Sequence, residues 1–595
     1  MSNVIRKVRS LVGLACALSL LFGCNTDSSN TNSSDTNPTS INSAKADTVY
    51  INGTVYTQDT EQSFAQAFAV TNGKFQAVGS TAEIKLLIGD NTAVVDLNNQ
   101  FVMPGLIDEH IHPDMAAENF MGINVNQTMT WQQMSEVIVK RTQQDSDKDW
   151  LIGGAIHWLD VAGKPMLGTS VASHFSTLDK LVNDRPVMLW DVGGHAVLLN
   201  SYAIKLLKLT KDSKVPTGGI FDVDASGELT GVFREIAANV IYEQALEGLP
   251  KGKVLIEKGL KPIFNQLNAF GITAISDAWA RYYMLDAYKV MAVNNELTVR
   301  VNAYVSDPIE WNNKVWKERA QWAIDNTQSY RVGDWLKADS VKFVLDGSAG
   351  GQTIIMVEPY EGTTDVHGGP WRNDPDYFAE KFAEYDKKGL TMKVHAVGSQ
   401  SIRTALDVIE KARKAGSTLR HNIAHTVFVH PDDKSRFAEL DVGAEFSPHF
   451  WYPVPGWEMI RAELGERRLN WVFPFNSIKQ QGVHVSVGSD WPVAASPNPF
   501  IELETMITRQ KPGGGLKTLP DENERISLKD AIEVFTIGGA YAQNREHLIG
   551  SIESGKLADF IVVDQNLFSI KPKEIHKTKV LKTVVGGKTV FEQSH

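Results

Sequence analysis

Residues 101–113 read FVMPGLIDEHIHP, an apolar run that ends in two histidines, His110 and His112. Residues two apart on an extended strand point the same way, so the two imidazoles would form a clamp at the end of a buried strand. Imidazole is a common ligand of divalent transition metals such as zinc. The pair therefore predicts a metal site at one edge of a sheet, with two incidental histidines as the alternative.

Four further candidate ligands lie at or near the ends of their own apolar runs. They are Lys342 in SVKFVLDG (340–347), His395 in TMKVHAVG (391–398), His425 in HNIAHTVFV (421–429) and Asp490 in GVHVSVGSDWP (482–492). In a parallel barrel the carboxyl ends of the strands face one mouth, so these side chains would converge with the first two histidines. Taken singly, His395 and His425 could be hydrogen-bonded core histidines, and Asp490 could cap a loop.

Lys342 and Asp490 carry the most specific chemical expectations. Burial in an apolar strand favours the neutral amine of Lys342, and a neutral amine can add carbon dioxide to become a carbamate that bridges two metals. A lysine that reaches solvent or pairs with Asp346 is an equal alternative, so one metal and two metals both stay open. A carboxylate at Asp490 can hold a metal and accept a proton, which makes it the candidate catalytic residue.

Strands and helices alternate through most of the chain. Amphipathic helical stretches such as 377–389 and 401–416 separate most of the apolar strand candidates. This pattern predicts an α/β fold, a (β/α)8 TIM barrel over residues 101–545. The gap from 107 to 271 is too long for one crossover, so a large insertion after strand 1, about residues 115–255, is expected. The eight strand candidates are 101–107, 271–276, 299–305, 340–345, 391–396, 421–426, 442–447 and 483–489.

Two β-rich segments flank the barrel, at residues 47–100 and 546–595. The first alternates in DTVYINGTVYT (47–57) and carries an Asn72-Gly73 turn between two apolar runs, which is a strong hairpin signal. The second contains LADFIVVD and KVLKTVVGGKTVF. Pairing the two segments into one small β-sandwich would bury strand edges that neither covers alone.

The first 24 residues are typical of a secretory signal. Arg6, Lys7 and Arg9 precede the apolar run LVGLACALSLLFG (11–23), which is too short for an ordinary spanning helix. Leu21-Phe22-Gly23-Cys24 resembles the lipobox of bacterial lipoproteins, which implies lipidation at Cys24. A cleaved signal with an incidental cysteine is the alternative.

Residues 25–46 follow this signal and contain 15 Ser, Asn or Thr residues, which predicts a disordered tether. The lipobox resemblance implies a lipoprotein at a membrane facing the periplasm or at the cell surface. Asn25, directly after the cysteine, favours the outer membrane by the same resemblance. Secretion to the periplasm is the alternative location.

The composition narrows the range of partners. A formal net charge of −11 gives no support for nucleic-acid binding. We expect membrane attachment only through the lipid anchor, a small-molecule substrate, and leave a homo-oligomer open. The only cysteines are Cys16 and Cys24, so no thiolate is available in the mature globule as a metal ligand.

The order of the candidate ligands resembles that of the amidohydrolase superfamily. Phrases such as VMPGLIDEHIHP, VKFVLDGSAGG and GVHVSVGSDWPV resemble its amidohydrolase-3 branch, which includes N-substituted formamide deformylases. The resemblance spans about residues 47–595 and implies a zinc-type site with one or two metals, a carboxylated lysine if two, and a sandwich built from both termini. Carried over, the metal shell comprises His110, His112, Lys342, His395, His425 and Asp490.

Four residues are candidate substrate contacts. His157 and Trp158 lie in IGGAIHWLD (152–160), where the family often has a glycine-tryptophan pair, and His449 lies in SPHFWYPVPGW (447–457). His195, in DVGGHAVLLNS (191–201), fits a family phrase and could instead brace the insertion. Five aromatic residues are candidates for a wall at the mouth, with ordinary packing as the alternative: Trp158, Trp190, Trp451, Tyr452 and Trp491.

The candidate ligands predict hydrolysis by metal-activated water. The family resemblance implies that the bond cleaved is a non-peptide carbon–nitrogen bond, in an amide or an N-substituted formamide. An ester or lactone hydrolase on the same site is the alternative enzyme, because the same water attacks either carbonyl. A non-catalytic surface binding protein is the third hypothesis. The presence of all six candidate ligands argues against it.

Overall fold

A computed structural model of the protein describes residues 44–594, except 126–128, 145–149, 159–169, 172–173, 192, 248, 250, 350–352, 365–370, 452–455 and 516–521. The expected signal at 1–24, the lipidation site Cys24 and nearly all of the tether lie outside the described residues. In the described part of the chain, no helix combines the length and the apolar character needed to cross a membrane.

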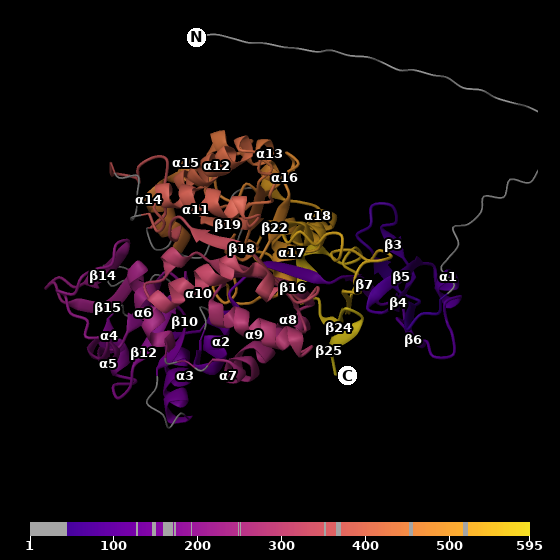
Figure 1. The fold of residues 1–595 in the computed structure, drawn as a ribbon, viewed down its shortest axis with the longest axis horizontal. Coiled ribbons are helices and arrows are strands. Elements are labelled where there is room, and N and C mark those ends of the chain that lie inside the picture. The colour runs from indigo at the N-terminus through magenta and orange to yellow at the C-terminus, as the bar shows by residue number, and fades with distance from the viewer. Residues whose placement is uncertain are drawn as a thin grey trace, which may run out of the picture. The chain divides into compact units, whose positions relative to one another are not determined.

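Eight parallel strands form the central barrel, which confirms the predicted TIM-barrel class (Figure 1). Their order in the sheet follows the order in the chain, and a parallel bridge between Ile111 and Trp491 joins the first strand to the segment after the last. The strands are β8 (Leu106–Ile111), β16 (Ile272–Ala280), β17 (Arg300–Ser306), β18 (Leu336–Val344), β19 (Thr391–Ala396), β20 (Asn422–His425), β21 (Gly443–Phe446) and β22 (Val485–Val487).

The strand expected at 101–107 is two strands. β7 (Phe101–Pro104) pairs in the terminal sandwich, and β8 then enters the barrel and contains His110. The chain changes sheets at Gly105, where an added Cβ would lie 2.2 Å from Oγ1 of Thr273. Only glycine fits this approach, so the break follows from sterics that an unbroken apolar run does not reveal.

Helices surround the barrel, as the amphipathic stretches predicted. The stretches at 377–389 and 401–416 correspond to α11 and α12, and α12 buries one row of apolar residues against the barrel. The helices that follow the strands are α9 (Tyr282–Val293), α10 (Lys314–Asp325), α11 (Pro375–Lys387), α12 (Ser399–Lys414), α13 (Arg436–Glu439), α14 (Gly456–Leu464), α15 (Glu466–Leu469), α16 (Phe475–Lys479), α17 (Pro499–Thr508), α18 (Leu528–Phe535) and α19 (Ile537–Ala542).

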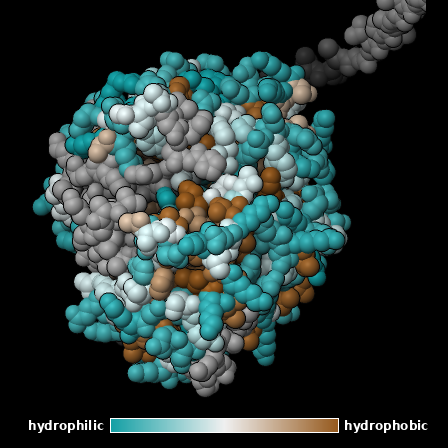
Figure 2. Space-filling model, turned by 90° about the vertical axis from the view of Figure 1, so that its left-hand side faces the viewer, coloured by the Kyte–Doolittle hydropathy of each residue, from teal (hydrophilic) through white to brown (hydrophobic). Residues whose placement is uncertain are grey.

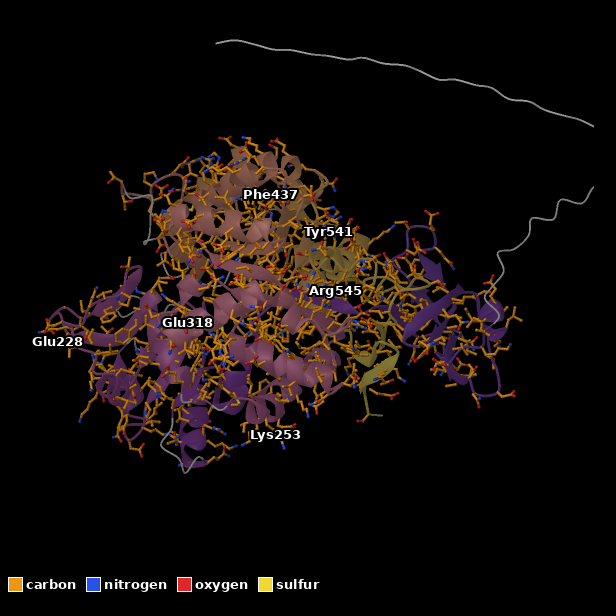
Figure 3. All side chains as sticks on the ribbon, in the orientation of Figure 1. Glu228, Lys253, Glu318, Phe437, Tyr541 and Arg545 are labelled. Atoms are coloured by element: carbon orange, nitrogen blue, oxygen red, sulfur yellow. The ribbon has the colours of Figure 1, made fainter. Side chains whose placement is uncertain are left out.

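The segment between β8 and β16 contains its own mixed sheet, in the order β11-β10-β12-β13-β15-β14, with β9 paired to β10. Glu228 marks the tip of its β14–β15 hairpin (Figure 3). The strands are β9 (Ile123–Asn124), β10 (Leu151–Trp158), β11 (Ser170–Val171), β12 (Val187–Asp191), β13 (Ala196–Leu199), β14 (Gly219–Val223) and β15 (Leu229–Glu235). The helices are α2 (Pro113–Met121), α3 (Trp131–Gln144), α4 (Phe175–Asp179), α5 (Ser201–Leu206), α6 (Ile236–Glu247), α7 (Lys253–Leu255) and α8 (Lys261–Ala269), with a π-helix at Ile256–Leu260.

Both ends of the described chain build a β-sandwich. One sheet has the order β5-β4-β1-β6, and the other has the order β25-β24-β23-β7-β2-β3, in which β23 pairs antiparallel with β7. The strands are β1 (Thr48–Ile51), β2 (Thr54–Tyr56), β3 (Phe64–Ala65), β4 (Ala67–Thr71), β5 (Lys74–Gly79), β6 (Ala93–Asp96), β23 (Phe560–Val563), β24 (Val580–Val585) and β25 (Lys588–Glu592), with helix α1 (Thr81–Lys85) before β6.

A tight turn within the sandwich and an ion pair between the sandwich and the barrel are its main local features. Asn72 and Gly73 take positive φ angles of 51° and 73° and join β4 to β5, which confirms the predicted hairpin. Arg300, at the start of β17, binds Asp559 through two hydrogen bonds of 2.6 and 2.9 Å, and both side chains are buried. Removing one partner of such a buried pair costs about 3–5 kcal/mol, so this contact fastens the sandwich to the barrel.

Candidate metal centre

The six predicted ligands lie at or near the carboxyl ends of five barrel strands. Each strand places its side chain at the same end of the barrel because all the strands are parallel. All six are buried, with at most 9% of the residue exposed. His110 lies in β8 and His112 follows it, Lys342 lies in β18, His395 in β19, His425 ends β20, and Asp490 follows β22.

His110, His112 and Asp490 form the tightest group. Each offers one ligand atom, and these atoms lie within 4.8 Å of one another. Oδ1 of Asp490 is 3.1 Å from Nε2 of His112 and 3.6 Å from Nε2 of His110. Nζ of Lys342 is 3.3 Å from the same His110 nitrogen. Nε2 of His110 therefore faces both a carboxylate and an amine.

The other two histidines continue a row of imidazoles. The ring centroids of His110 and His425 are 4.6 Å apart, and those of His425 and His395 are also 4.6 Å apart. Nε2 of His395 lies 3.1 Å from the backbone oxygen of Gly347, to which it can donate a hydrogen bond. The structure thus brings all six predicted ligands together at one place.

Burial sets the protonation of these groups. It holds the pKa values of His110 and His395 well below the ordinary histidine value and lowers the pKa of His425 to about 3. Burial alone would raise the pKa of Asp490, but the neighbouring His112 and His425 imidazoles hold it below its ordinary value. At neutral pH His110, His395 and His425 are therefore neutral and Asp490 is ionised, which are the forms that bind metals.

The backbone around Asp490 is held in an uncommon conformation. Asp490 has a φ of 57°, and His425 has a φ of 70°. The backbone N–H of Asp490 donates to the carbonyl of His110 at 2.7 Å, and the Asp108 carboxylate accepts from the backbone and the hydroxyl of Ser489 at 2.9 and 2.6 Å. Such strained residues concentrate at functional sites, where the surrounding contacts compensate their cost.

Glu445 is a candidate functional residue that was not predicted from the sequence. It lies in β21, and its carboxylate contacts Nδ1 of His110 while also binding the buried Lys393 of β19. Lys393 in turn lies 3.6 Å from a carboxylate oxygen of Glu109. A carboxylate on Nδ1 fixes the tautomer of a histidine and presents Nε2 to the metal. A lone glutamate inside the apolar run 442–447 was the available signal.

We expect Glu445→Gln to weaken metal binding by about 10–100-fold, the range found when such outer partners of a ligand histidine are lost. The glutamine amide cannot hold His110 as a carboxylate does, although it fills nearly the same volume. Titration with a metal-binding indicator dye measures the change. Glu504→Gln removes a carboxylate paired with His576, away from the ligand strands, and should bind metal as the parent does. Equal affinity in both variants would show that Glu445 does not act through the metal site.

The four candidate substrate contacts lie at different distances from the cluster of ligands. His195 approaches the cluster, with its ring centroid 5.4 Å from that of His395. His449 follows β21 and is partly buried, and its Nε2 lies 4.0 Å from Glu502 of α17. This nitrogen has no hydrogen-bond partner among the described residues. His157 and Trp158 end β10, and their side chains lie outside the described residues.

Of the aromatic candidates for a wall at the mouth, some pack in the core and one lies close to the ligands. Trp451 is fully buried, with its ring centroid 5.3 Å from that of Phe475, and Trp190 packs on Gly154, so ordinary packing explains both. Trp491 is close to the site, because its backbone oxygen accepts from the N–H of His112 at 2.9 Å. Tyr452 lies outside the described residues.

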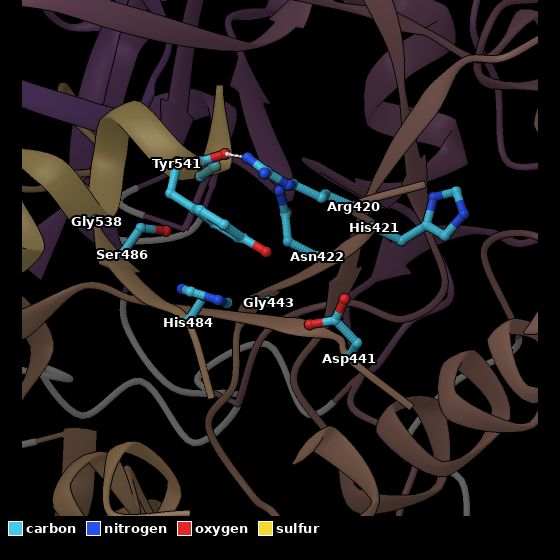
Figure 4. A pocket seen from close by; sticks show the side chains of 10 residues that line it. Arg420, His421, Asn422, Asp441, Gly443, His484, Ser486, Gly538 and Tyr541 are labelled. Carbon is cyan, nitrogen blue, oxygen red and sulfur yellow. Dashed lines mark hydrogen bonds between the residues drawn. The ribbon is translucent and has the colours of Figure 1, made fainter. Parts of the chain in front are cut away.

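A small cavity lies at the opposite end of the barrel, around the amino ends of β20, β21 and β22 (Figure 4). The ring of His484 stacks on that of Tyr541 at a centroid distance of 3.5 Å, and the Arg420 guanidinium lies 3.6 Å from the same ring. The remaining space of about 20 Å³ holds roughly one water molecule. This cavity is too small for a substrate.

The residues of the cluster fit a divalent metal. Oδ1 of Asp490 is buried and makes no hydrogen bond with any described residue, although imidazole nitrogens lie 3.1 and 3.6 Å from it. Buried polar atoms are almost always paired, so an unpaired carboxylate oxygen facing two imidazole nitrogens is what a shared cation explains. Neutral histidines with carboxylates are typical ligands of zinc and related ions.

The sequence model of the amidohydrolase family matches residues 93–591, which include every ligand of the cluster. The chain belongs to the amidohydrolase family. This amidohydrolase is 28% identical to the Arabidopsis thaliana protein LONG AFTER FAR-RED 3, over 92% of each chain. It is 25% identical to the N-substituted formamide deformylase of Arthrobacter pascens, over 92% of this chain and 99% of the other.

Solved structures support the fold of this amidohydrolase. An uncharacterised metal-dependent hydrolase from Pyrococcus horikoshii OT3 superposes with a TM-score of 0.68 at 22% sequence identity. The match covers 88% of this chain and 99% of that one. Its counterpart from Pyrococcus furiosus superposes with a TM-score of 0.66.

Proposed function

We propose that this amidohydrolase cleaves the carbon–nitrogen bond of an amide or an N-substituted formamide and uses zinc as its divalent metal. The convergence of His110, His112 and Asp490 within 4.8 Å, with Lys342 3.3 Å from His110, carries this proposal. A divalent metal at such a site polarises a carbonyl and lowers the pKa of water. The similarity to a relative named N-substituted formamide deformylase supports the choice of bond.

The histidines and Asp490 have different proposed roles, metal binding and proton transfer. The neutral histidines would hold the metal through their ring nitrogens. Asp490, ionised and aimed at the cluster, would accept a proton from the attacking water and pass it to the departing nitrogen. An amine is a poor leaving group until it is protonated, so this transfer suits the cleavage of an amide.

Apolar groups close to the ligands support a substrate with an apolar substituent. The Trp279 ring lies 6.5 Å from that of His112, and the Phe120 ring lies 6.5 Å from that of Trp491. Figure 2 views the molecule from the left-hand side of Figure 1 and shows apolar side chains gathered at the centre of this face. Pockets for small molecules combine such apolar walls with a few polar groups.

We expect Lys342 to carry a carbamate and to bridge two metals. Burial lowers the pKa of Lys342 to about 7, so much of the amine is neutral at physiological pH and can add carbon dioxide. Carbon-13 NMR of protein loaded with metal and labelled bicarbonate should show one carbamate signal, which Lys342→Met abolishes. Lys393 is equally buried but is bound by Glu445, so it should stay unmodified. A spectrum without a carbamate signal would contradict this expectation and would favour a site with one metal and an unmodified Lys342.

Metal analysis followed by a substrate screen tests the proposed function. Purified protein should contain zinc and should release amines from N-formyl and N-acyl compounds faster than it cleaves matched esters or lactones. Removal of the metal by a chelator should stop the reaction, and zinc should restore it. Faster cleavage of esters or lactones would show that the enzyme acts on a carbon–oxygen bond instead. Full activity after removal of the metal would contradict a metal-dependent reaction.

We also propose that the enzyme is a lipoprotein, anchored at the outer membrane through Cys24. The basic residues, the apolar run and the cysteine stand in the order of a lipoprotein signal, and a polar tether follows them. Cys24→Ala is expected to block lipidation, so the protein should shift from the membrane fraction to the soluble fraction or accumulate unprocessed. Cys16→Ala serves as the matched control and should leave fractionation unchanged. A Cys24→Ala protein that matures normally and stays in the membrane would contradict the anchor.

A further inference from the structure

Three nitrogen atoms beside the candidate metal centre are buried and have no hydrogen-bond partner among the described residues. They are Nδ1 of His112, Nε1 of Trp279 and Nη2 of Arg372. The ring centroids of His112 and Trp279 are 6.5 Å apart, and Cζ of Arg372 lies 5.0 Å from the centroid of the Trp279 ring. The three unpaired nitrogens therefore belong to neighbouring side chains.

Trp279 lies near the carboxyl end of β16, the same end of the barrel as the candidate ligands. Its backbone N–H donates to the Asp277 carboxylate at 3.1 Å. In the described chain the indole nitrogens of Trp190 and Trp451 are also buried and unpaired, but these two residues are at most 2% exposed, whereas Trp279 is partly exposed. Of these three tryptophans, Trp279 is therefore the one that a molecule in the mouth can contact.

Arg372 is held at the end of the fourth barrel strand. Its backbone N–H donates to the carbonyl of Leu345, directly after β18, at 3.0 Å. Its buried guanidinium lies 3.1 Å from the carboxylate of Glu310 and 3.4 Å from that of Glu235. Because two carboxylates already balance its single positive charge, Arg372 does not favour a further anion. An uncharged oxygen is the acceptor that suits its remaining N–H groups.

The unpaired nitrogens of Trp279 and Arg372 can only donate. An indole N–H and a guanidinium N–H carry their protons at every physiological pH. His112 is a third donor when its Nε2, which lies 3.1 Å from Asp490, holds the metal, because Nδ1 then carries the ring proton. Buried polar atoms are almost always paired, so these adjacent donors require an acceptor that the described residues do not supply.

We propose that Trp279 donates its indole N–H to an uncharged oxygen of the substrate, in a subsite bordered by His112 and Arg372; this inference rests on the proposed amide hydrolysis. One oxygen at about 2.9 Å from each donor nitrogen can contact both rings, since their centroids are 6.5 Å apart. Nδ1 of His112 points away from the nitrogen that faces Asp490, so this oxygen is not the carbonyl oxygen under attack. The subsite therefore favours amides whose substituent carries an ether, hydroxyl or second carbonyl oxygen.

Matched pairs of formamides test this preference. One methylene group of the alkyl compound is replaced by an ether oxygen in N-(2-methoxyethyl)formamide against N-butylformamide, and in N-(3-methoxypropyl)formamide against N-pentylformamide. A buried donor left unpaired is costly, so the metal-loaded parent should prefer the ether of at least one pair by about 10-fold in kcat/KM. Trp279→Phe keeps an aromatic ring but lacks the N–H. It should lower kcat/KM for that ether to the level of the alkyl compound and leave the alkyl compound unchanged.

Trp311→Phe is the matched control for Trp279→Phe. The Trp311 ring centroid lies 5.9 Å from that of Trp279, but its indole N–H already donates to Oγ of Ser306 at 3.0 Å. Its loss should therefore leave the preference for the ether in place. Equal kcat/KM for ether and alkyl compound in every pair, or a preference that survives Trp279→Phe, would overturn the inference. A parent that cleaves none of the formamides would overturn the proposed function.

Nuclear magnetic resonance of the indole groups tests binding without turnover. The protein is labelled with nitrogen-15 at tryptophan, loaded with metal and carries Asp490→Asn to prevent cleavage. The indole N–H signal that Trp279→Phe removes should move downfield when the preferred ether is added, and should move less with its alkyl analogue. The signal that Trp311→Phe removes should stay in place. A Trp279 signal that stays in place at saturating ether would overturn the inference and would indicate that water alone occupies the subsite.

Discussion

Replacing Asp490 by asparagine is expected to lower kcat for amides by at least about 100-fold, while most of the bound metal is retained. The asparagine amide keeps an oxygen toward His110 and His112 but cannot accept a proton at neutral pH. The other ligands stay in place, so the loss falls mainly on proton transfer rather than on metal binding. Metal content and steady-state kinetics of the same preparation separate the two effects.

The leaving group provides a second comparison for Asp490→Asn. An amide needs a proton on its departing nitrogen, whereas a good phenolate leaves without one. The variant should therefore lose more activity toward 4-nitroformanilide than toward an activated phenyl ester. Asp386→Asn removes the carboxylate paired with His421 at the other end of the barrel. This variant should keep its activity toward both the amide and the ester. A metal-loaded Asp490→Asn enzyme that cleaves amides at the parent rate would place the proton path elsewhere.

Replacing His110 by alanine should remove most of the activity together with the metal. Nε2 of His110 lies 3.6 Å from Asp490 and 3.3 Å from Lys342, so its loss opens the centre of the cluster. We expect metal affinity to fall by more than about 100-fold, beyond the range for an outer partner such as Glu445. Competition with a chelator measures this change, and circular dichroism checks that the fold is intact.

His484→Ala is the control for His110→Ala. His484 stacks on Tyr541 at the amino end of β22, where the cavity is too small for a substrate. Its loss should leave metal affinity and kcat unchanged. If His110→Ala retained the parent metal content and the parent activity, the assignment of the metal centre would be wrong.

The sequence predicted the barrel and the convergence of the candidate ligands because each strand leaves a local signal. The histidines and Asp490 end apolar runs, and parallel strands bring such ends together whatever the loops between them. The alternation of strands with amphipathic helices predicted the fold class, and Asn72-Gly73 predicted a hairpin through turn chemistry. These inferences depend only on neighbouring residues.

The features that the sequence did not reveal depend on contacts between distant residues. Glu445 binds His110 across 335 positions of the chain, and nothing near Glu445 indicates that partner. The break at Gly105 depends on Thr273, a residue of the next barrel strand. Trp451 was one of the aromatic candidates for a wall at the mouth, with ordinary packing as the alternative, and its contacts with Phe475 and Arg509 place it in the core. Pattern alone cannot rank such alternatives.

The pairing of β7 with β23 has a consequence for the synthesis of the chain. β7 leads directly into β8, the strand that carries His110, yet its partner in the sheet is β23, Phe560–Val563, which is synthesised long after the barrel strands. Contacts between such distant segments form slowly because the intervening loop must first close. We therefore expect nascent chains that stop before residue 560 to be sensitive to protease near β7 and unable to retain metal, and protection should appear only when β23 has been released.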